Sequence, residues 1–108
     1  MLRFIFVGVY AAAACAAHAQ TIEVAPELWD RPRTGSALLA QDSVKSAVLA
    51  ALARPEAQIV IHHSSGQDPL VQAEELRSWL GALAIDTRRI ALRSDLGPGA
   101  AIKIEILP

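Results

Sequence analysis

The residues with the most chemistry to offer lie in one short polar stretch, His62–Asp68, which reads His-His-Ser-Ser-Gly-Gln-Asp. Imidazole and carboxylate groups are common ligands of zinc. Adjacent residues of a strand point to opposite faces, so His62 and His63 reach one ion only if the strand has ended before them. Beyond residue 19 the chain holds no third histidine and no cysteine. The donor set is therefore incomplete, and we expect neither a metal nor another cofactor.

A serine beside a histidine also suggests a nucleophile and its base. Ser64 and Ser65 follow the histidine pair, but the sequence shows no nucleophile-elbow motif and no evident oxyanion hole. Residues 66–69 fall where a helix begins and offer backbone amides to an anion, although a turn followed by a helix cap explains them equally well. We therefore expect a protein that is not an enzyme.

The elements around this stretch predict a loop at the carboxyl end of a strand. Residues 59–61 are a continuous apolar run, which is typical of a strand covered on both faces. Asp68 and Pro69 predict the cap and the first position of a helix that runs to Ala84. A further short strand is expected at residues 90–92. Open α/β sheets tend to bind ligands at such a loop.

The other elements follow from hydrophobic periodicity. Residues 36–53 predict a helix, which starts either near Leu38 or at a cap formed by Asp42 or Ser43. Its predicted apolar stripe is Val44, Val48 and Leu52, and the stripe of the second helix is Ala73, Leu76, Leu80, Leu83 and Ala84. Residues 21–24 and the alternating isoleucines at 102, 104 and 106 predict strands.

The resulting element order is β-α-β-α-β-β. Two helices on one face of a mixed sheet would bury both helical stripes at once. The sequence therefore predicts an α/β fold of the two-layer α+β type.

The first nineteen residues have the features of a secretory signal peptide. Arg3 precedes a short apolar run at residues 4–14, and Ala17-His18-Ala19 fits the small-x-small cleavage pattern. The run is shorter than the roughly 20 residues that span a bilayer, so we expect no membrane span. Residues 12–15 also resemble a bacterial lipobox that would place a lipid anchor on Cys15. Plain secretion is favoured, because Ala12 stands where such boxes usually carry leucine.

Charge limits the choice of partners. The chain has 10 basic and 11 acidic residues, so removing Arg3 leaves nine against eleven, a net charge of −2. The signs alternate along the chain and form no block. Such a surface does not attract nucleic acid or an anionic membrane.

The central pattern resembles the periplasmic OmpA-like domain, the peptidoglycan-associating module also seen in flagellar stator proteins. The family signature Arg-Ala-x-x-Val-x-x-x-Leu-x-x-x-Gly-Ile-x-x-x-Arg-Ile corresponds here to Gln72-Ala73, Leu76, Leu80, Ala84-Ile85 and Arg89-Ile90. Pro55, Ile59 and Ile61 keep the family's upstream spacing. The resemblance covers roughly residues 36–92. It implies an OmpA-like domain over residues 36–108, after an amino-terminal strand and linker at 20–35.

The departures from the family concern its ligand site. The family binds the diaminopimelate part of peptidoglycan with an Asp in a Gly-His-Thr-Asp turn and with the Arg of the helix motif. Residues 63–66 fall over that turn and contain no acid, and Gln72 replaces the arginine. A site that has lost both charged anchors is not expected to bind in the family's usual way. The remaining candidate ligand-binding residues are His63, Ser65, Asp68 and Gln72.

Three functions stay open at this point. The first is a small exported protein of the periplasm or the secreted fraction, which binds an envelope protein or a cell-wall component without catalysis. The second is a peptidoglycan-binding protein with rearranged site residues. The third is a small secreted hydrolase or metal binder that uses the His62–Asp68 loop.

Overall fold

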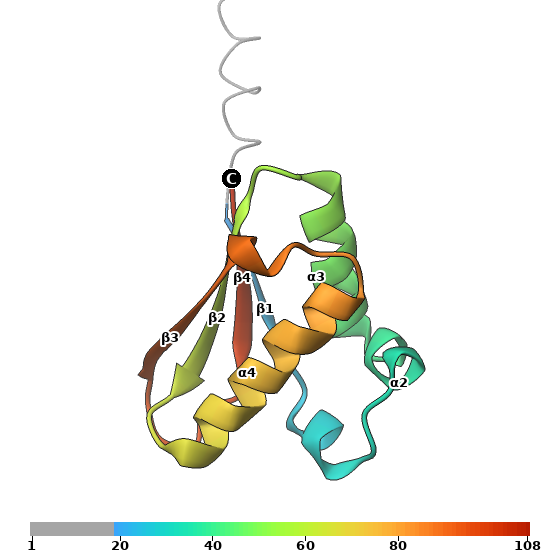
Figure 1. Cartoon of the computed structure of the whole chain (residues 1–108). Helices are drawn as coiled ribbons and strands as arrows, with labels where there is room; N and C mark the ends of the chain where they lie inside the picture. Colours follow the sequence, from blue (N-terminus) through green and yellow to red (C-terminus); the bar gives the residue numbers. More distant parts are fainter. Residues whose placement is uncertain (1–18) are drawn as a thin grey trace, which may run out of the picture.

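The computed structural model describes residues 19–108, so the predicted signal segment and the candidate lipid site at Cys15 lie outside the described residues except for Ala19. Helices cover one face of a four-stranded sheet (Figure 1). In chain order the elements are β1 (Gln20–Glu23), the 3-10 turn η2 (Pro26–Asp30), α2 (Gly35–Ala40), α3 (Asp42–Ala53), β2 (Gln58–Ser64), α4 (Gln67–Ala82), the 3-10 turn η3 (Thr87–Arg89), β3 (Ile90–Leu96) and β4 (Lys103–Leu107). The predicted two-layer α+β class is confirmed.

The sheet is mixed, with the strand order β1-β4-β2-β3. Strands β2 and β3 are parallel and are joined through α4, whereas β4 runs antiparallel to both β1 and β2. Ile61 of β2 lies beside Leu92 of β3 and Ile104 of β4. This register places Ile61, Leu92 and Ile104 together on the face that the helices cover, whereas the buried Val60 points to the opposite face.

Strand β4 shows how the alternating pattern builds the core. Ile104 and Ile106 are buried against the helices, while Lys103 and Glu105 lie half-buried on the opposite face. Val24 and Leu28, just after β1 and within η2, belong to the same core. The amino-terminal stretch therefore packs as part of the domain.

The first predicted helix is divided into α2 and α3 by Gln41, whose ψ of 118° is extended. Thr34 caps α2 by accepting a hydrogen bond from the amide of Ala37. The stripe prediction was partly wrong, because the buried face of α3 is Val44, Ala47, Val48 and Ala51. Leu52 lies outside this face and is 45% exposed.

Helix α4 begins one residue before the predicted cap. Gly66 is the N-cap residue, with φ of 119°, so Asp68 lies in the first turn instead of capping it. A carboxylate in the first turn still interacts favourably with the helix dipole. The predicted stripe is buried at Ala73, Leu76 and Leu80.

The carboxyl end of α4 differs from the prediction. Leu83 is half-buried and Ala84 is exposed beyond the end of the helix. Ala84 adopts a left-handed conformation with φ of 79°, and this reversal lets the amide of Ile85 bond the carbonyl of Leu80 at 3.0 Å. The chain therefore turns sharply and buries Ile85 in the core.

Two neighbouring arginines after α4 have different partners. Arg88 pairs with Asp86 at 2.7 Å. Arg89 instead donates to three backbone carbonyls at the end of α3 and the loop after it, those of Ala51, Arg54 and Ala57. Arg89 thus joins the start of β3 to the carboxyl end of α3, where carbonyls lack helical partners.

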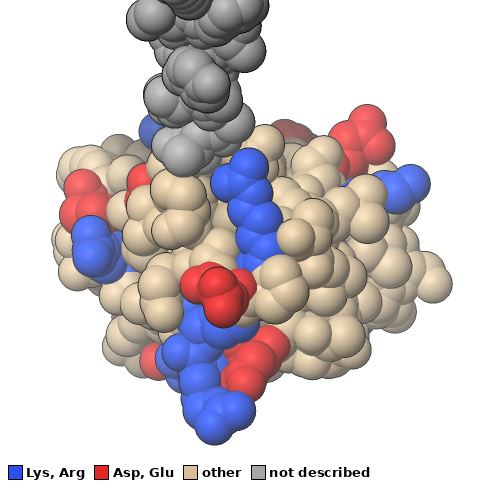
Figure 2. Space-filling view, turned by 90° about the horizontal axis from the view of Figure 1, so that it is seen from above, with Lys and Arg blue, Asp and Glu red and all other residues tan. Residues whose placement is uncertain are grey.

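The surface is mixed in charge. On the face seen in Figure 2, basic side chains cross the middle with acidic side chains beside them, so neither sign forms an extended patch there. Within residues 19–108, no helix is long and apolar enough to cross a membrane.

Candidate functional site

The histidine pair belongs to a strand and not to a loop. β2 continues through Ser64, which leaves only Ser65 and Gly66 between it and α4. The predicted loop His62–Asp68 is therefore wrong in its extent. Because the strand alternates, His62 lies on the sheet face away from the helices, and His63 lies toward them. The two imidazoles do not share one ion.

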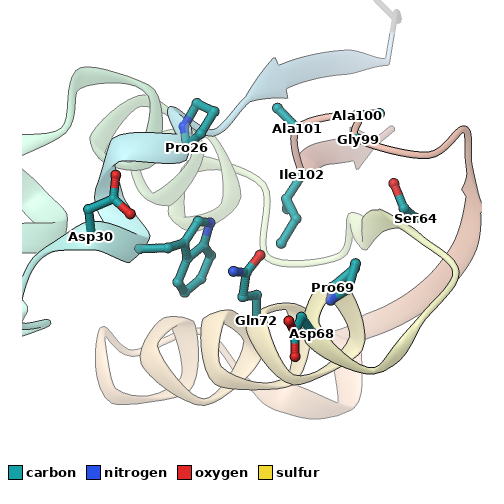
Figure 3. Close-up of a pocket in the computed structure, with 11 residues that line it drawn as sticks. Pro26, Asp30, Ser64, Asp68, Pro69, Gln72, Gly99, Ala100, Ala101 and Ile102 are labelled. Atoms are coloured by element: carbon teal, nitrogen blue, oxygen red, sulfur yellow. The ribbon is translucent and has the colours of Figure 1, made fainter.

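A pocket of about 340 Å³ opens at the carboxyl end of β2 (Figure 3). Four parts of the chain build it: the turn η2, the last residue of β2, the first two turns of α4 and the connection between β3 and β4. Its lining residues are Pro26, Trp29, Asp30, Ser64, Asp68, Pro69, Gln72, Gly99, Ala100, Ala101 and Ile102. The position agrees with the rule that ligands bind beyond the carboxyl ends of strands.

The polar groups of the pocket are carboxylates and an amide. Asp30 and Asp68 contribute carboxylates, and within residues 19–108 no lysine or arginine lines the pocket. The amide of Gln72 points from α4 into it (Figure 3). Trp29 adds an aromatic surface. This lining offers hydrogen bonds and negative charge but no cation for a carboxylate of a ligand.

The Trp29 wall is fixed to α4 by Arg33. The Arg33 guanidinium lies over the Trp29 ring, 5.6 Å from its centre, and donates to the Trp29 carbonyl at 3.1 Å. Its Nε and Nη2 donate to the two carboxylate oxygens of Glu75 at 2.7 and 3.0 Å. The indole nitrogen of Trp79 also donates to Glu75. The hydrogen bond from Arg33 is the main reason that the pKa of Glu75 falls below its ordinary value.

The opposite wall is tied to β2. The Ser64 hydroxyl donates to the carbonyl of Gly97 at 2.6 Å, and Gly97 begins the connection that lines the pocket. At the other end of this connection, the carbonyl of Ile102 accepts from the amide of Val24 at 2.8 Å. Hydrogen bonds at both ends therefore hold the β3–β4 connection in place.

The predicted ligand-binding residues separate into two groups. Asp68 and Gln72 line the pocket together. His63 is only 4% exposed and donates from Nδ1 to the carbonyl of Ser64 at 2.8 Å, and Ser65 faces solvent outside the lining. The longer β2 explains this separation, because it carries His63 into the core instead of onto a loop.

Several lining residues were not predicted from the sequence. Trp29 and Asp30 lie more than thirty positions before the predicted loop, and the only signal was an aromatic residue in a proline-rich stretch. Residues 99–102 carry no chemical signal at all, because they contribute mainly backbone and small side chains. Both segments reach the pocket through the strand order, which places β4 next to β2.

His62 takes part in a separate cluster on the face of the sheet away from the helices. Its Nδ1 lies 2.8 Å from a carboxylate oxygen of Asp95, and its Nε2 lies 2.9 Å from one of Glu105. Burial alone would lower the pKa of His62, but the hydrogen bonds to Glu105 and Asp95 together outweigh burial and raise the pKa. Ionised carboxylates only accept hydrogen bonds, so this arrangement favours the doubly protonated ring.

No pair of reactive groups is assembled in the described part of the chain around the pocket. The Ser64 hydroxyl donates to a carbonyl, and His63 is bound to the main chain. Among residues 19–108 no group of three His, Cys, Asp or Glu side chains could hold a metal ion. Comparison with protein-family models, curated proteins and solved structures finds no match to this chain.

Proposed function

We propose that this chain is a non-enzymatic binding module of the bacterial cell envelope, exported and built on an OmpA-like scaffold. The observation that carries the proposal is the pocket at the carboxyl end of β2, which holds Asp68 and Gln72 against Trp29 without a nucleophile–base pair. Such a lining suits recognition of a polar group. The ligand belongs to an envelope protein or a cell-wall component.

Two local features support the OmpA-like resemblance. Ala84 adopts the left-handed conformation where the family pattern has glycine, and glycine is the residue that adopts this conformation most readily. Arg89 matches the arginine before the family's final isoleucine, and it has a structural role because it donates hydrogen bonds to carbonyls at the carboxyl end of α3. Both features concern the scaffold, so they bear on the fold more than on the ligand.

The pocket has a carboxylate that could bind a ligand's ammonium group but lacks, in the part of the chain that the structure describes, a guanidinium for a ligand's carboxylate. Asp68 places a carboxylate in the lining, close in space to the turn where the family carries its aspartate. Gln72 occupies the position of the family's arginine, and an amide does not replace a guanidinium as a partner for a carboxylate. Diaminopimelate carries both ammonium and carboxylate groups. The proposal is therefore that any retention on peptidoglycan is weak.

Cosedimentation with purified sacculi tests this proposal. The exported protein is expected to stay in the supernatant at physiological salt, whereas Gln72→Arg raises retention because it adds a guanidinium to the lining beside Asp68, one helical turn away. Gly66→Asp is a poor way to restore the acid, since φ of 119° is strained for any residue other than glycine. Ser78→Arg adds the same single positive charge at an exposed position of α4 and serves as the control.

The outcome separates the alternatives. Strong retention of the unmodified protein, abolished by Asp68→Asn, would favour a peptidoglycan-binding protein with rearranged residues. Hydrolysis of a cell-wall or ester substrate that is lost in Ser64→Ala would contradict the non-enzymatic assignment. Trp79→Phe leaves Trp29 as the only tryptophan, so fluorescence then reports directly on occupation of the pocket by soluble wall fragments.

A further inference from the structure

The cluster around His62 joins three strands at the end of the sheet near the pocket. His62 is on β2, Asp95 is near the end of β3 and Glu105 is on β4. The His62 side chain is only 14% exposed. Two carboxylates lie within 2.9 Å of its two nitrogens, and a doubly protonated ring donates to both of them at once when they are ionised.

The cluster also lies next to one wall of the pocket. Asp95 is two residues before Gly97, where the β3–β4 connection begins, and Gly99 and Ala100 of that connection line the pocket. β3 is an edge strand, and its pairing with β2 shifts register between His62 and Ser64. Beyond this shift, the end of β3 is held to β2 by the Ser64–Leu96 pair and by the Ser64 hydroxyl, which donates to the Gly97 carbonyl.

We propose that His62 is a proton-dependent clasp that sets the position of the β3–β4 connection and so the shape of the pocket. With both nitrogens protonated, His62 holds Asp95 and Glu105 at once. When it loses one proton it donates to only one carboxylate, and the bare nitrogen faces the lone pairs of the other. Asp95 is the partner that leaves, since it is 48% exposed on an edge strand, whereas Glu105 is 24% exposed on an inner strand.

Other charged groups on the same face modify this equilibrium without replacing the clasp. In register beside His62 lie Arg93 of β3 and Lys103 of β4, whose positive charges favour the neutral ring. Glu23 of β1 pairs with Lys103 and lies one strand further away. The helices cover the opposite face, so α2, α3 and α4 bring no charge against the ring.

Ser64 supplies a second tie that does not depend on pH. Its hydroxyl donates to the Gly97 carbonyl at 2.6 Å, and because a serine hydroxyl does not titrate between about pH 5 and 9, we expect this bond in both states of His62. Loss of the Asp95 contact therefore loosens the connection without releasing it. Removing the hydroxyl should enlarge the pH-dependent loosening of the β3–β4 connection and leave the midpoint of that change unaltered.

This inference deepens the proposed function, because the wall belongs to the same pocket, but its test needs no ligand, so the two can fail separately. Isotope-labelled exported protein is titrated by NMR between about pH 5 and 9, around the ordinary histidine pKa of about 6.5. The His62 ring, identified by its loss in His62→Gln, should keep both nitrogens protonated above that value. The amides of Gly97, Gly99 and Ala100 should shift with the same midpoint.

Hydrogen exchange of the Ala100 amide, which bonds the Gly97 carbonyl, measures the loosening. After correction for the intrinsic rate at each pH, its protection should fall several-fold through the midpoint. Asp95→Asn should abolish this change while His62 still titrates, and Ser64→Ala should increase it. Glu23→Gln changes an exposed carboxylate on the same face and should leave the pH-dependent change in Ala100 protection unaltered.

Either of two results would overturn the proposal. One is a His62 ring that becomes neutral at or below the ordinary histidine pKa. The other is a connection whose amide shifts and exchange protection do not follow His62, or follow it equally in Asp95→Asn.

Discussion

Arg33 and Glu75 are 42 positions apart in the chain and form a two-pronged ion pair, with nitrogen–oxygen distances of 2.7 and 3.0 Å. The pair joins the stretch after η2 to the middle of α4. Since Arg33 also covers the Trp29 ring, the same contact holds one wall of the pocket in place.

We predict that Arg33→Lys lowers the melting temperature almost as much as Arg33→Ala. A lysine keeps the charge but lacks the planar fork that reaches both oxygens of Glu75. The expected loss is a few degrees, with a change in Trp29 fluorescence. Arg31→Ala removes an exposed arginine from the same turn and is the control. Full stability in Arg33→Lys would show that only charge matters here.

A second prediction concerns the buried face of α4. Leu80→Asp should unfold the domain, because Leu80 is 1% exposed and an unpaired buried carboxylate costs several kcal/mol, comparable with the stability of a small domain. Glu74→Ala, on the exposed face, should change the free energy of unfolding by less than about 0.5 kcal/mol. Thermal unfolding monitored by circular dichroism compares them. Equal shifts for the two variants would mean that the helix faces are wrongly assigned.

A third prediction concerns close packing at the end of α4. A Cβ added at Gly81 would lie 2.8 Å from Cγ2 of Thr87, which is too close. Gly81→Ala alone should therefore yield little of the roughly 1 kcal/mol that alanine gains over glycine in a helix. In a Thr87→Ser background, which lacks that methyl group, the same change should stabilise the protein. Denaturant unfolding of the unmodified protein, the two single variants and the double variant measures the coupling free energy between the two positions. If the two single changes in unfolding free energy simply add up in the double variant, the predicted contact is contradicted.

The fourth prediction is a pH-dependent stability that involves His62. Hydrogen bonds to Glu105 and Asp95 leave its pKa raised in the folded state despite the opposing effect of burial. The stabilisation is thus fully present below the unfolded pKa of about 6.5 and is lost as pH rises through the folded pKa. The difference in unfolding free energy between the unmodified protein and His62→Gln should shrink from pH 6 to pH 9, values that bracket this range.

Urea unfolding at each pH gives this difference directly, and His63 is present in both proteins. Glu105→Gln should also reduce the pH dependence, because it removes one of the two acceptors. If the difference in unfolding free energy between the unmodified protein and His62→Gln instead grows toward alkaline pH, the pKa of His62 is lowered by folding and not raised. That result would exclude a charged His62 in the folded protein.

The sequence by itself determined the element order and the class of fold. Isoleucines that alternate along β4 and apolar residues at helical spacing along α4 decide which faces are buried, and these patterns are local. Asp68 was placed near a ligand site because it follows a buried strand, and Gln72 because it stands where the OmpA-like pattern has an arginine. Ends of elements were less well predicted: the apolar run at 59–61 gave no sign that β2 continues through two histidines and a serine.

Only the tertiary structure decided which distant residues meet. Trp29 and Gln72 line the same pocket, Arg33 pairs with Glu75, and His62 lies between Asp95 and Glu105 because of the strand order and the path of η2. Periodicity fixes the direction of a side chain relative to its own element, but the partner across a sheet depends on strand neighbours and register. Those are set by the burial of the whole core at once, which no local pattern specifies.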